Sequence, residues 1–340
     1  MLTPTNVIAI FITISLVFVP IGVVWVIASA NVVETSQRYD KQCMPGMSRT
    51  MAEYTLASHL YDGVPCTIPL YIPKTMRAPV YLYYEIKNFY QNHRRFVKSR
   101  DASQLRGDSI VGSEDCGSQR FLGSDTSRPI VPCGLSAWSM FNDTYTLKIP
   151  SPIVDVHAMP IANCTSGGGQ AYCDVPVRET GIAWNLDQRE NFGQVVPQNF
   201  NLGDPLFKGY RGGSTVRSTL KHDEHFIVWM RTATLSHFRK LWGVIDMDLP
   251  GGTTVLVNIN NAYNTYQFNG EKAVVLSTVE WIGGKNYFVG YTYIGVGITS
   301  LLMGLIYLIL HVKYPRQLGD MEALSWRKMG LNIDSAVHKS

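Results

Sequence analysis

Two long uncharged runs lie near the ends of this 340-residue chain, at residues 7–30 and 287–310. A helix needs about 20 predominantly apolar residues to cross the hydrocarbon core of a bilayer, so each run is long enough to span it. The sequence therefore predicts two transmembrane helices that flank one large domain held on a single side of the membrane.

Each run has a competing interpretation. The small residues 28–30 could form a signal-peptidase site, which would leave one span in the mature protein. No Lys or Arg precedes the first run, and the run is longer than an ordinary signal core, which favours an uncleaved anchor. The second run could be a buried core helix, but its length and the Lys and Arg residues after it favour a span followed by a cytosolic tail. The predicted segments are a cytosolic N-terminus (1–6), a first transmembrane helix (7–30), a lumenal or extracellular domain (31–286), a second transmembrane helix (287–312) and a cytosolic tail (313–340).

Period-two alternation marks strands inside the large domain. Residues 80–89 and 254–260 alternate apolar and polar positions, which is typical of half-buried strands. A further apolar strand is predicted at residues 272–278, after the hairpin dipeptide Asn269-Gly270.

The other segments give weaker patterns. Residues 226–230 form an apolar run of strand length, and apolar residues recur at helical spacing over 236–245, which predicts an amphipathic helix there. Residues 43–66, between two cysteines, are rich in turn formers and are predicted to be a stapled loop. Residues 107–213 are rich in Gly, Pro, Ser, Asn and Asp, which predicts long loops.

Composition limits the function classes. The net charge of +4 is modest and includes no concentrated basic block, which argues against nucleic-acid binding. Both N-glycosylation sequons, at Asn142 and Asn163, and all six cysteines lie between the two uncharged runs. Glycosylation and disulfide formation take place on the lumenal side, so both agree with the predicted orientation. Six cysteines allow 15 pairings, and the spacing favours sequence neighbours. These are Cys43 with Cys66, Cys116 with Cys133 and Cys164 with Cys173.

Candidate catalytic motifs are incomplete. Residues 134–138 lack the last glycine of the G-x-S-x-G elbow of serine hydrolases. Residues 222–225, HDEH, lack the H-E-x-x-H order of a zinc site, and residues 283–286 lack the first half of a phosphate-binding loop. We expect no catalytic residue, metal site or cofactor, and hence a protein that is not an enzyme.

One basic run leaves two interpretations open. Arg94, Arg95, Lys98 and Arg100 lie among aromatic residues in segment 88–100. They could form a solvated turn or short helix, or tie the domain's own strands together. Alternatively, the paired arginines could bind lipid head groups or acidic loops of a partner, because a guanidinium pairs bidentately with phosphate or carboxylate.

Several ordered motifs resemble one family. The segment 88–100 (NFYQNHRRFVKSR) is accompanied by five others along the chain, and the C-terminal residues 319–326 are similar to those of plant members. Together they resemble the accessory beta subunits of type IV P-type ATPases, the lipid flippases, in the cell-division-cycle-fifty or ligand-effect-modulator family. The plant members are the ALA-interacting subunits. The five other motifs are FNDT (141–144), GIAW (181–184), FIVWMRTAT (226–234), FRKL (238–241) and WIGGKN (281–286).

The resemblance implies a fold and a function. Such proteins have two membrane helices with cytosolic termini and a glycosylated, disulfide-bonded, mainly antiparallel β ectodomain with a few short helices. They bind a catalytic ATPase as a heterodimer, escort it out of the endoplasmic reticulum and support phospholipid transport in Golgi, endosomal and plasma membranes. Cys116 and Cys133 fall where the family has a disulfide, and Asn142 falls in its sequon. The alternatives are a stand-alone lumenal cargo receptor and a subunit of a two-span ligand-gated channel.

Overall fold

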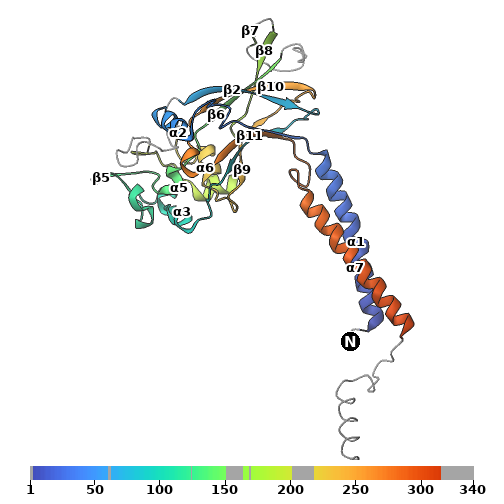
Figure 1. Ribbon diagram of the computed structural model, residues 1–340. Coiled ribbons are helices and arrows are strands. Elements are labelled where there is room, and N and C mark those ends of the chain that lie inside the picture. Colours follow the sequence, from blue (N-terminus) through green and yellow to red (C-terminus); the bar gives the residue numbers. More distant parts are fainter. Residues whose placement is uncertain are drawn as a thin grey trace, which may run out of the picture. The chain divides into compact units, whose positions relative to one another are not determined.

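The computed structural model describes residues 3–59, 63–123, 125–150, 164–167, 170–200 and 218–314 (Figure 1). The predicted glycosylation residue Asn163 and the predicted cytosolic tail beyond residue 314 lie outside these ranges. The chain divides into two compact units. One comprises Met1–Asn31 with Glu280–Ser340, and the other is Val32–Val279.

The first unit is a pair of apolar helices, α1 (Pro4–Asn31) and α7 (Tyr287–Lys313), both long and apolar enough to cross a membrane. The two helices approach closely at Gly22 and Gly290, where a Cβ on Gly290 would lie 3.1 Å from the carbonyl oxygen of Gly22. Small residues permit such close packing of membrane helices. At the start of α7, the Asn286 side chain caps the helix by accepting a hydrogen bond from the Phe288 N–H.

The second unit contains two main antiparallel sheets and a small third one. The four-stranded sheet has the order β1 (Glu34–Arg38), β11 (Glu271–Ser277), β3 (Val80–Lys87), β9 (Phe238–Ile245). The five-stranded sheet has the order β2 (Val64–Ile72), β10 (Thr253–Asn261), β6 (Thr144–Pro150), β8 (Gln170–Val175), β7 (Cys164–Gly167). The third sheet pairs β4 (Phe121–Leu122) with β5 (Asp125–Pro129). The predicted fold class, two apolar helices flanking a mainly antiparallel β domain, is confirmed.

A single main core lies between the two large sheets. Alternate residues of β3, such as Leu82 and Ile86, are fully buried, and Val255 and Val257 of β10 join them in the same hydrophobic cluster. This explains why the period-two pattern predicted these strands correctly, because each buries one face. The strand predicted at 272–278 is β11, displaced by one residue.

Short helices cover the rest of the domain. They are α2 (Arg49–Ser58), α3 (Arg94–Lys98), α4 (Ala102–Arg106), α5 (Leu135–Trp138), α6 (Glu224–Met230), the 3-10 helices Glu114–Gln119 and Tyr266–Phe268, and the π-helix Asp187–Asn191. Helix α2 corrects the prediction that residues 43–66 form a loop. Ser48 caps this helix, and its buried Ala52 and Leu56 pack in a small separate cluster.

The predictions for two neighbouring segments were wrong, because the predicted strand is a helix and the predicted helix is a strand. Residues 226–230, predicted as a strand, lie in α6, which Asp223 initiates by accepting a hydrogen bond from the Phe226 N–H. Residues 236–245, predicted as a helix, contain strand β9, which pairs with β3. Every residue from Trp242 to Ile245 is buried, so this strand is enclosed on both faces and its apolar positions do not alternate.

The dipeptide Asn269-Gly270 does not form the predicted hairpin. The strands on either side of it, β10 and β11, belong to different sheets. Asn269 has a left-handed conformation (φ 56°) that ends the 3-10 helix Tyr266–Phe268. A residue type that favours positive φ is thus used to end a helical turn.

Disulfides join the cysteines as sequence neighbours: Cys43 with Cys66, Cys116 with Cys133 and Cys164 with Cys173. The last pair lies directly across the β7–β8 ladder. Residues 107–213, predicted as long loops, contain several strands and short helices in their described parts.

Candidate partner-binding surface and its supports

The basic run folds into the short helix α3. His93 precedes the helix, and its ring Nδ1 accepts a hydrogen bond from the Arg95 N–H. Phe96 is buried and fixes the helix to the core. Arg94, Arg95 and Lys98 are exposed, and their side chains make no hydrogen bond or ion pair with any described residue. The structure thus places three cations on the surface rather than in the domain's own contacts.

Arg100 is separated from these three residues. Its guanidinium donates a hydrogen bond to the carbonyl oxygen of Met230 (3.3 Å), at the end of α6. It lines a different hollow of about 400 Å³, together with Arg106 and Arg231. The predicted set of four basic residues therefore belongs to two places.

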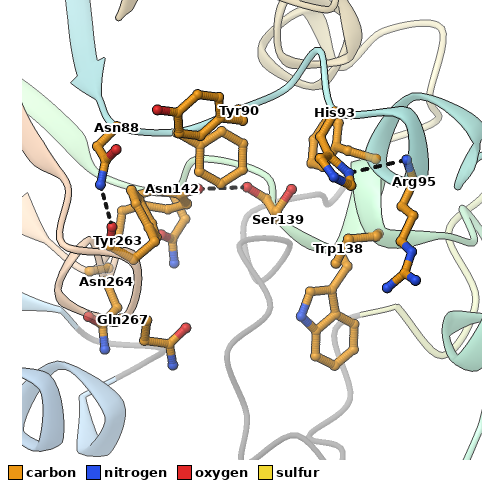
Figure 2. A pocket seen from close by; sticks show the side chains of 15 residues that line it. Asn88, Tyr90, His93, Arg95, Trp138, Ser139, Asn142, Tyr263, Asn264 and Gln267 are labelled. Carbon is orange, nitrogen blue, oxygen red and sulfur yellow. Dashed lines mark hydrogen bonds between the residues drawn. The ribbon is translucent and has the colours of Figure 1, made fainter. Parts of the chain in front are cut away.

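A second hollow, of about 480 Å³, lies beside α3, and we call it the aromatic hollow (Figure 2). Its lining comes from α3, α5 and the segments before β6 and after β10. Rings supply most of the surface, and amide, imidazole and guanidinium groups supply the polar part. The rings are those of Phe89, Tyr90, Phe96, Trp138, Tyr263 and Phe268, and the polar residues are Asn88, His93, Arg95, Ser139, Asn142, Asn264 and Gln267.

Beside this hollow, a fully buried ion pair joins the two sheets. The ammonium of Lys272 on β11 lies 2.6 Å from the carboxylate of Asp143, which immediately precedes β6. The other carboxylate oxygen accepts hydrogen bonds from the Ala262 and Tyr263 N–H groups, each 2.6 Å long. Tyr39 donates a hydrogen bond (2.6 Å) to the carboxylate oxygen that Lys272 contacts. Burial lowers the pKa of Lys272, and the charge of Asp143 opposes that shift.

A second buried lysine holds the end of α6. The Lys240 ammonium, on β9, donates to the carbonyl oxygens of Val228, Trp229 and Arg231. These carbonyls have no partner within the helix, and a cation at a helix C-terminus is favourable. Burial lowers the pKa of Lys240 to about 7. The Lys240 side chain therefore joins α6 to β9.

The acidic and histidine residues of 222–225 serve the fold. Glu224 accepts hydrogen bonds from the N–H groups of residues 181, 182 and 183, which shapes the GIAW loop. The next residue of that loop, Trp184, is 63% exposed, and the guanidinium carbon of Arg231 lies 4.0 Å from its ring centroid. His225 contacts Glu179 instead of another histidine. Among the described residues no group of three metal-binding side chains is present.

Residues 134–138 also have a structural role. Ser136 is buried, and its hydroxyl donates to the carbonyl oxygen of Phe96 (2.6 Å), which connects α5 to α3. Gly134 has a φ of +96°, and a Cβ there would lie 2.2 Å from the Ser99 carbonyl oxygen. Glycine is therefore required where this turn passes the end of α3.

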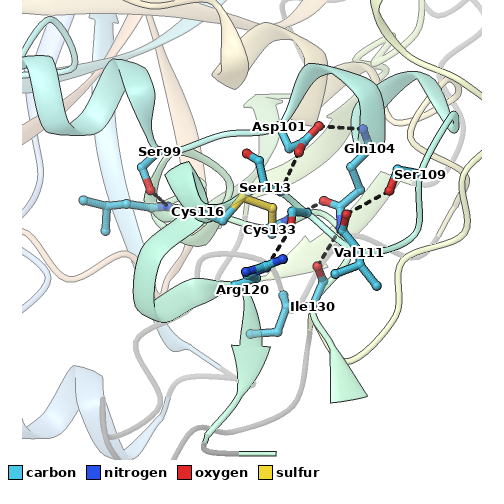
Figure 3. Close-up of a disulfide and its surroundings, with 12 residues drawn as sticks. Ser99, Asp101, Gln104, Ser109, Val111, Ser113, Cys116, Arg120, Ile130 and Cys133 are labelled. Atoms are coloured by element: carbon cyan, nitrogen blue, oxygen red, sulfur yellow. Dashed lines mark hydrogen bonds between the residues drawn. A yellow bond between two sulfur atoms is a disulfide. The ribbon is translucent and has the colours of Figure 1, made fainter. Parts of the chain in front are cut away.

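The Cys116–Cys133 disulfide lies within a hydrogen-bonded loop (Figure 3). Gln104 donates to the carbonyl oxygens of Ile110 and Ile130 and accepts from the Cys133 N–H. Asp101 caps α4 and also accepts from the Ser113 N–H. Burial raises the pKa of Asp101, but its hydrogen bonds outweigh this effect and lower the pKa to about 2.

The structural contacts of Asp143, Glu224, Lys240 and Lys272 could not be predicted from sequence patterns. Asp143 lies inside the sequon at Asn142, and Lys240 lies in the segment 236–245 that is predicted to be an amphipathic helix. A lysine at the start of an otherwise apolar strand was the available signal for Lys272.

The chain matches known proteins along most of its length. The family model described as "LEM3 (ligand-effect modulator 3) family / CDC50 family" matches residues 25–317. ALA-interacting subunit 3 of Arabidopsis thaliana is 42% identical, over 96% of this chain and 86% of the relative. Cell cycle control protein 50A of Mus musculus is 34% identical, over 92% and 85%. Cell cycle control protein 50B of Homo sapiens is 34% identical, over 76% and 74%. The chain, with its two apolar helices and antiparallel β domain, therefore belongs to the LEM3 (ligand-effect modulator 3) family / CDC50 family.

Proposed function

We propose that this chain is the non-catalytic accessory subunit of a phospholipid-translocating P-type ATPase. It binds the catalytic subunit as a heterodimer and supports its folding, its exit from the endoplasmic reticulum and its lipid transport. The observation that carries the proposal is the likeness to ALA-interacting subunit 3, which covers nearly all of both chains. It therefore includes the two apolar helices and the whole domain between them.

The buried polar groups support a binding role. The hydroxyl of Ser136, the carboxylates of Asp143 and Glu224, and the ammonium groups of Lys240 and Lys272 all bind other parts of the same domain. An acid, base or nucleophile needs a reactive atom that can reach a substrate. These groups are instead used in the packing of helices and sheets.

The proposed topology puts both termini in the cytosol and the domain in the lumen or outside the cell. Two spans return the chain to its starting side, and the basic residues that follow α7 favour the cytosol. Three disulfides within the domain suit an oxidising compartment. The protein then resides in endoplasmic reticulum, Golgi or endosomal, and plasma membranes.

The proposed contact surface is the exposed face of α3. Arg94, Arg95 and Lys98 can pair with carboxylates on the lumenal loops of the ATPase, because no described residue neutralises them. A hydrogen bond to a charged group contributes about 1.5–3 kcal/mol. Arg100 can contact the partner only at the edge of this surface, because its guanidinium donates a hydrogen bond to the carbonyl oxygen of Met230.

Co-expression with candidate catalytic subunits tests this proposal. A true partner should leave the endoplasmic reticulum and co-purify only when this chain is present. The double substitution Arg94→Ala and Arg95→Ala should lower the apparent affinity about tenfold, which corresponds to about 1.4 kcal/mol. Lys74→Ala with Arg77→Ala removes the same charge from exposed residues between β2 and β3 and should leave recovery unchanged. Recovery of soluble lumenal cargo without any ATPase would contradict the proposal.

A further inference from the structure

Asn142 occupies an unusual place for a glycosylation residue. It carries the sequon Asn142-Asp143-Thr144 and lines the aromatic hollow, yet only 5% of it is exposed. Its amide oxygen is buried and accepts no hydrogen bond from any described residue. An unsatisfied buried polar group costs about 1–3 kcal/mol. The protein part of the site is therefore incomplete at this side chain.

The aromatic hollow beside Asn142 is large enough to hold a ligand that would supply the missing hydrogen bond. Figure 2 shows the Asn142 side chain between Tyr263 and Asn264 on one side and Ser139 and Trp138 on the other. The volume of about 480 Å³ lies within the range of roughly 300–1,000 Å³ that holds small ligands.

The lining suits a carbohydrate. Rings such as Tyr90 and Trp138 offer flat apolar surface, while His93, Asn264 and Gln267 offer hydrogen-bonding groups. A pyranose ring has an apolar C–H face and a polar edge of hydroxyl groups, so it matches a site with both kinds of group. Aromatic residues are well suited to such contacts because they supply large rigid surfaces with a polar tip.

We propose that the first two N-acetylglucosamine residues of an N-linked glycan on Asn142 occupy the aromatic hollow and complete the packing of the domain there. This inference rests on the proposed function, which places the domain in the lumen. In the attachment step, the Asn142 amide nitrogen forms a bond to sugar C1 and loses one proton. The C1–oxygen bond to a lipid diphosphate donor breaks, and the lipid diphosphate departs.

The order of events follows from burial. A transferase cannot reach a residue of which only 5% is exposed, so the sugar is attached to the unfolded chain and the domain then folds around it. Hydroxyl and acetamido groups of the first sugar then provide hydrogen-bond donors next to the buried amide oxygen. The glycan thereby acts as a part of the core rather than as a surface label.

Native glycosidase digestion tests the inference. The full chain, purified from a glycosylating host, is treated before and after denaturation with an amidase that cleaves the Asn–sugar bond. Site occupancy is then measured by mass spectrometry. The folded protein should lose the Asn142 glycan at least tenfold more slowly than the Asn163 glycan, and denaturation should equalise the rates.

Two matched substitutions show where the protection arises. Tyr90→Ala opens the hollow and should accelerate release from Asn142. Tyr71→Ala removes an equally exposed ring (57% each) on β2, away from the hollow, and should not. Thr144→Ala removes the sequon and should lower the melting temperature by several degrees, whereas Thr144→Ser keeps both the glycan and the stability.

The outcomes separate the two proposals. Equal release from Asn142 and Asn163 in the folded chain, or an unmodified Asn142 beside a modified Asn163, overturns the inference and leaves the accessory-subunit proposal intact. Protection that appears only with a bound ATPase also overturns it, because the partner then covers the hollow. A chain with neither residue modified contradicts the lumenal placement itself.

Discussion

Asp143 joins several parts of the domain through its carboxylate. Its two oxygens accept hydrogen bonds from Tyr39, Lys272 and two backbone N–H groups that follow β10. It thereby ties the start of β6 to both large sheets. A buried ion pair adds little net stability, but its geometry is satisfied here by additional hydrogen bonds, and removal of one partner leaves an uncompensated charge.

Lys272→Met should therefore destabilise the domain severely, by about 3–5 kcal/mol, because the Asp143 carboxylate remains buried without its cation. Thermal unfolding of the purified chain measures the loss. Adding Asp143→Asn, which preserves the sequon, should restore part of the stability. Lys148→Met is the control, since the Lys148–Asp174 pair is longer (3.7 Å) and half-exposed, and it should cost less than about 1 kcal/mol. A double mutant as unstable as the single one would contradict this account.

The stability that Asp101 contributes to the fold should depend on pH. Its pKa of about 2 in the folded protein lies below the ordinary 3.8, so the folded state binds fewer protons than the unfolded state between these values. The stabilisation is present above pH 3.8 and is lost as the pH falls toward 2. Melting temperatures of the wild type and Asp101→Asn should differ at pH 5, by an equivalent of about 1–2 kcal/mol, and converge as the pH falls to about 2.

Asp108→Asn is the control for this effect. Asp108 lies on the surface, where it pairs with Arg106, and its side chain is 60% exposed. Its melting temperature should follow the wild type across the same pH range. A difference between the wild type and Asp101→Asn that stays constant below pH 4 would rule out titration of Asp101 as the cause.

At the scale of elements, sequence patterns predicted the strands that bury one face. Strands β3 and β10 alternate visibly because one face meets the core. The pattern failed at α6 and β9, where burial on nearly all sides removes the alternation. The residue that indicated a helix in this part of the sequence was Asp223, a capping residue just before the apolar run.

The same limit applied to the candidate site. The basic run was found from the sequence because charged residues normally stay on the surface, as Arg94 and Arg95 do. Lys240 and Lys272 break that rule, and their partners come from segments distant in sequence or from backbone carbonyls. The aromatic hollow is assembled from three separate stretches of the chain, 88–96, 135–142 and 262–268, so only the folded chain shows that Asn142 lies in it.

The contact between α1 and α7 depends on glycine at defined positions. A Cβ on Gly290 would lie 2.6 Å from a methyl group of Val26, whereas a Cβ on Gly295 would meet nothing within 4 Å. Gly290→Leu should therefore separate the helices and cost about 1–3 kcal/mol, and Gly295→Leu should be tolerated. Thermal denaturation of the full chain in detergent compares them. Equal melting temperatures for the two variants would show that the helices do not pack through this face.

The whole molecule combines two helices long and apolar enough to cross a membrane with a large antiparallel β domain. The helices contribute length and small-residue contacts, and the domain contributes disulfides, a buried ion pair and a charged surface. An accessory subunit of this design can fold around its own core and still offer exposed groups to a partner.

The topology gives the last prediction. With two spans and a cytosolic N-terminus, the tail after α7 must be cytosolic and out of reach of the glycosylation enzymes. An Asn-x-Thr acceptor introduced after Trp326 should remain unmodified, while the same acceptor placed between β2 and β3 should gain a glycan and shift the mobility of the protein. Glycosidase treatment should reverse that shift. Cleavage of the first helix as a signal peptide would leave one span and a free end near residue 31, which N-terminal sequencing would detect. Modification of the tail acceptor would contradict the orientation and, with it, the proposal that the basic face of α3 meets the lumenal loops of an ATPase.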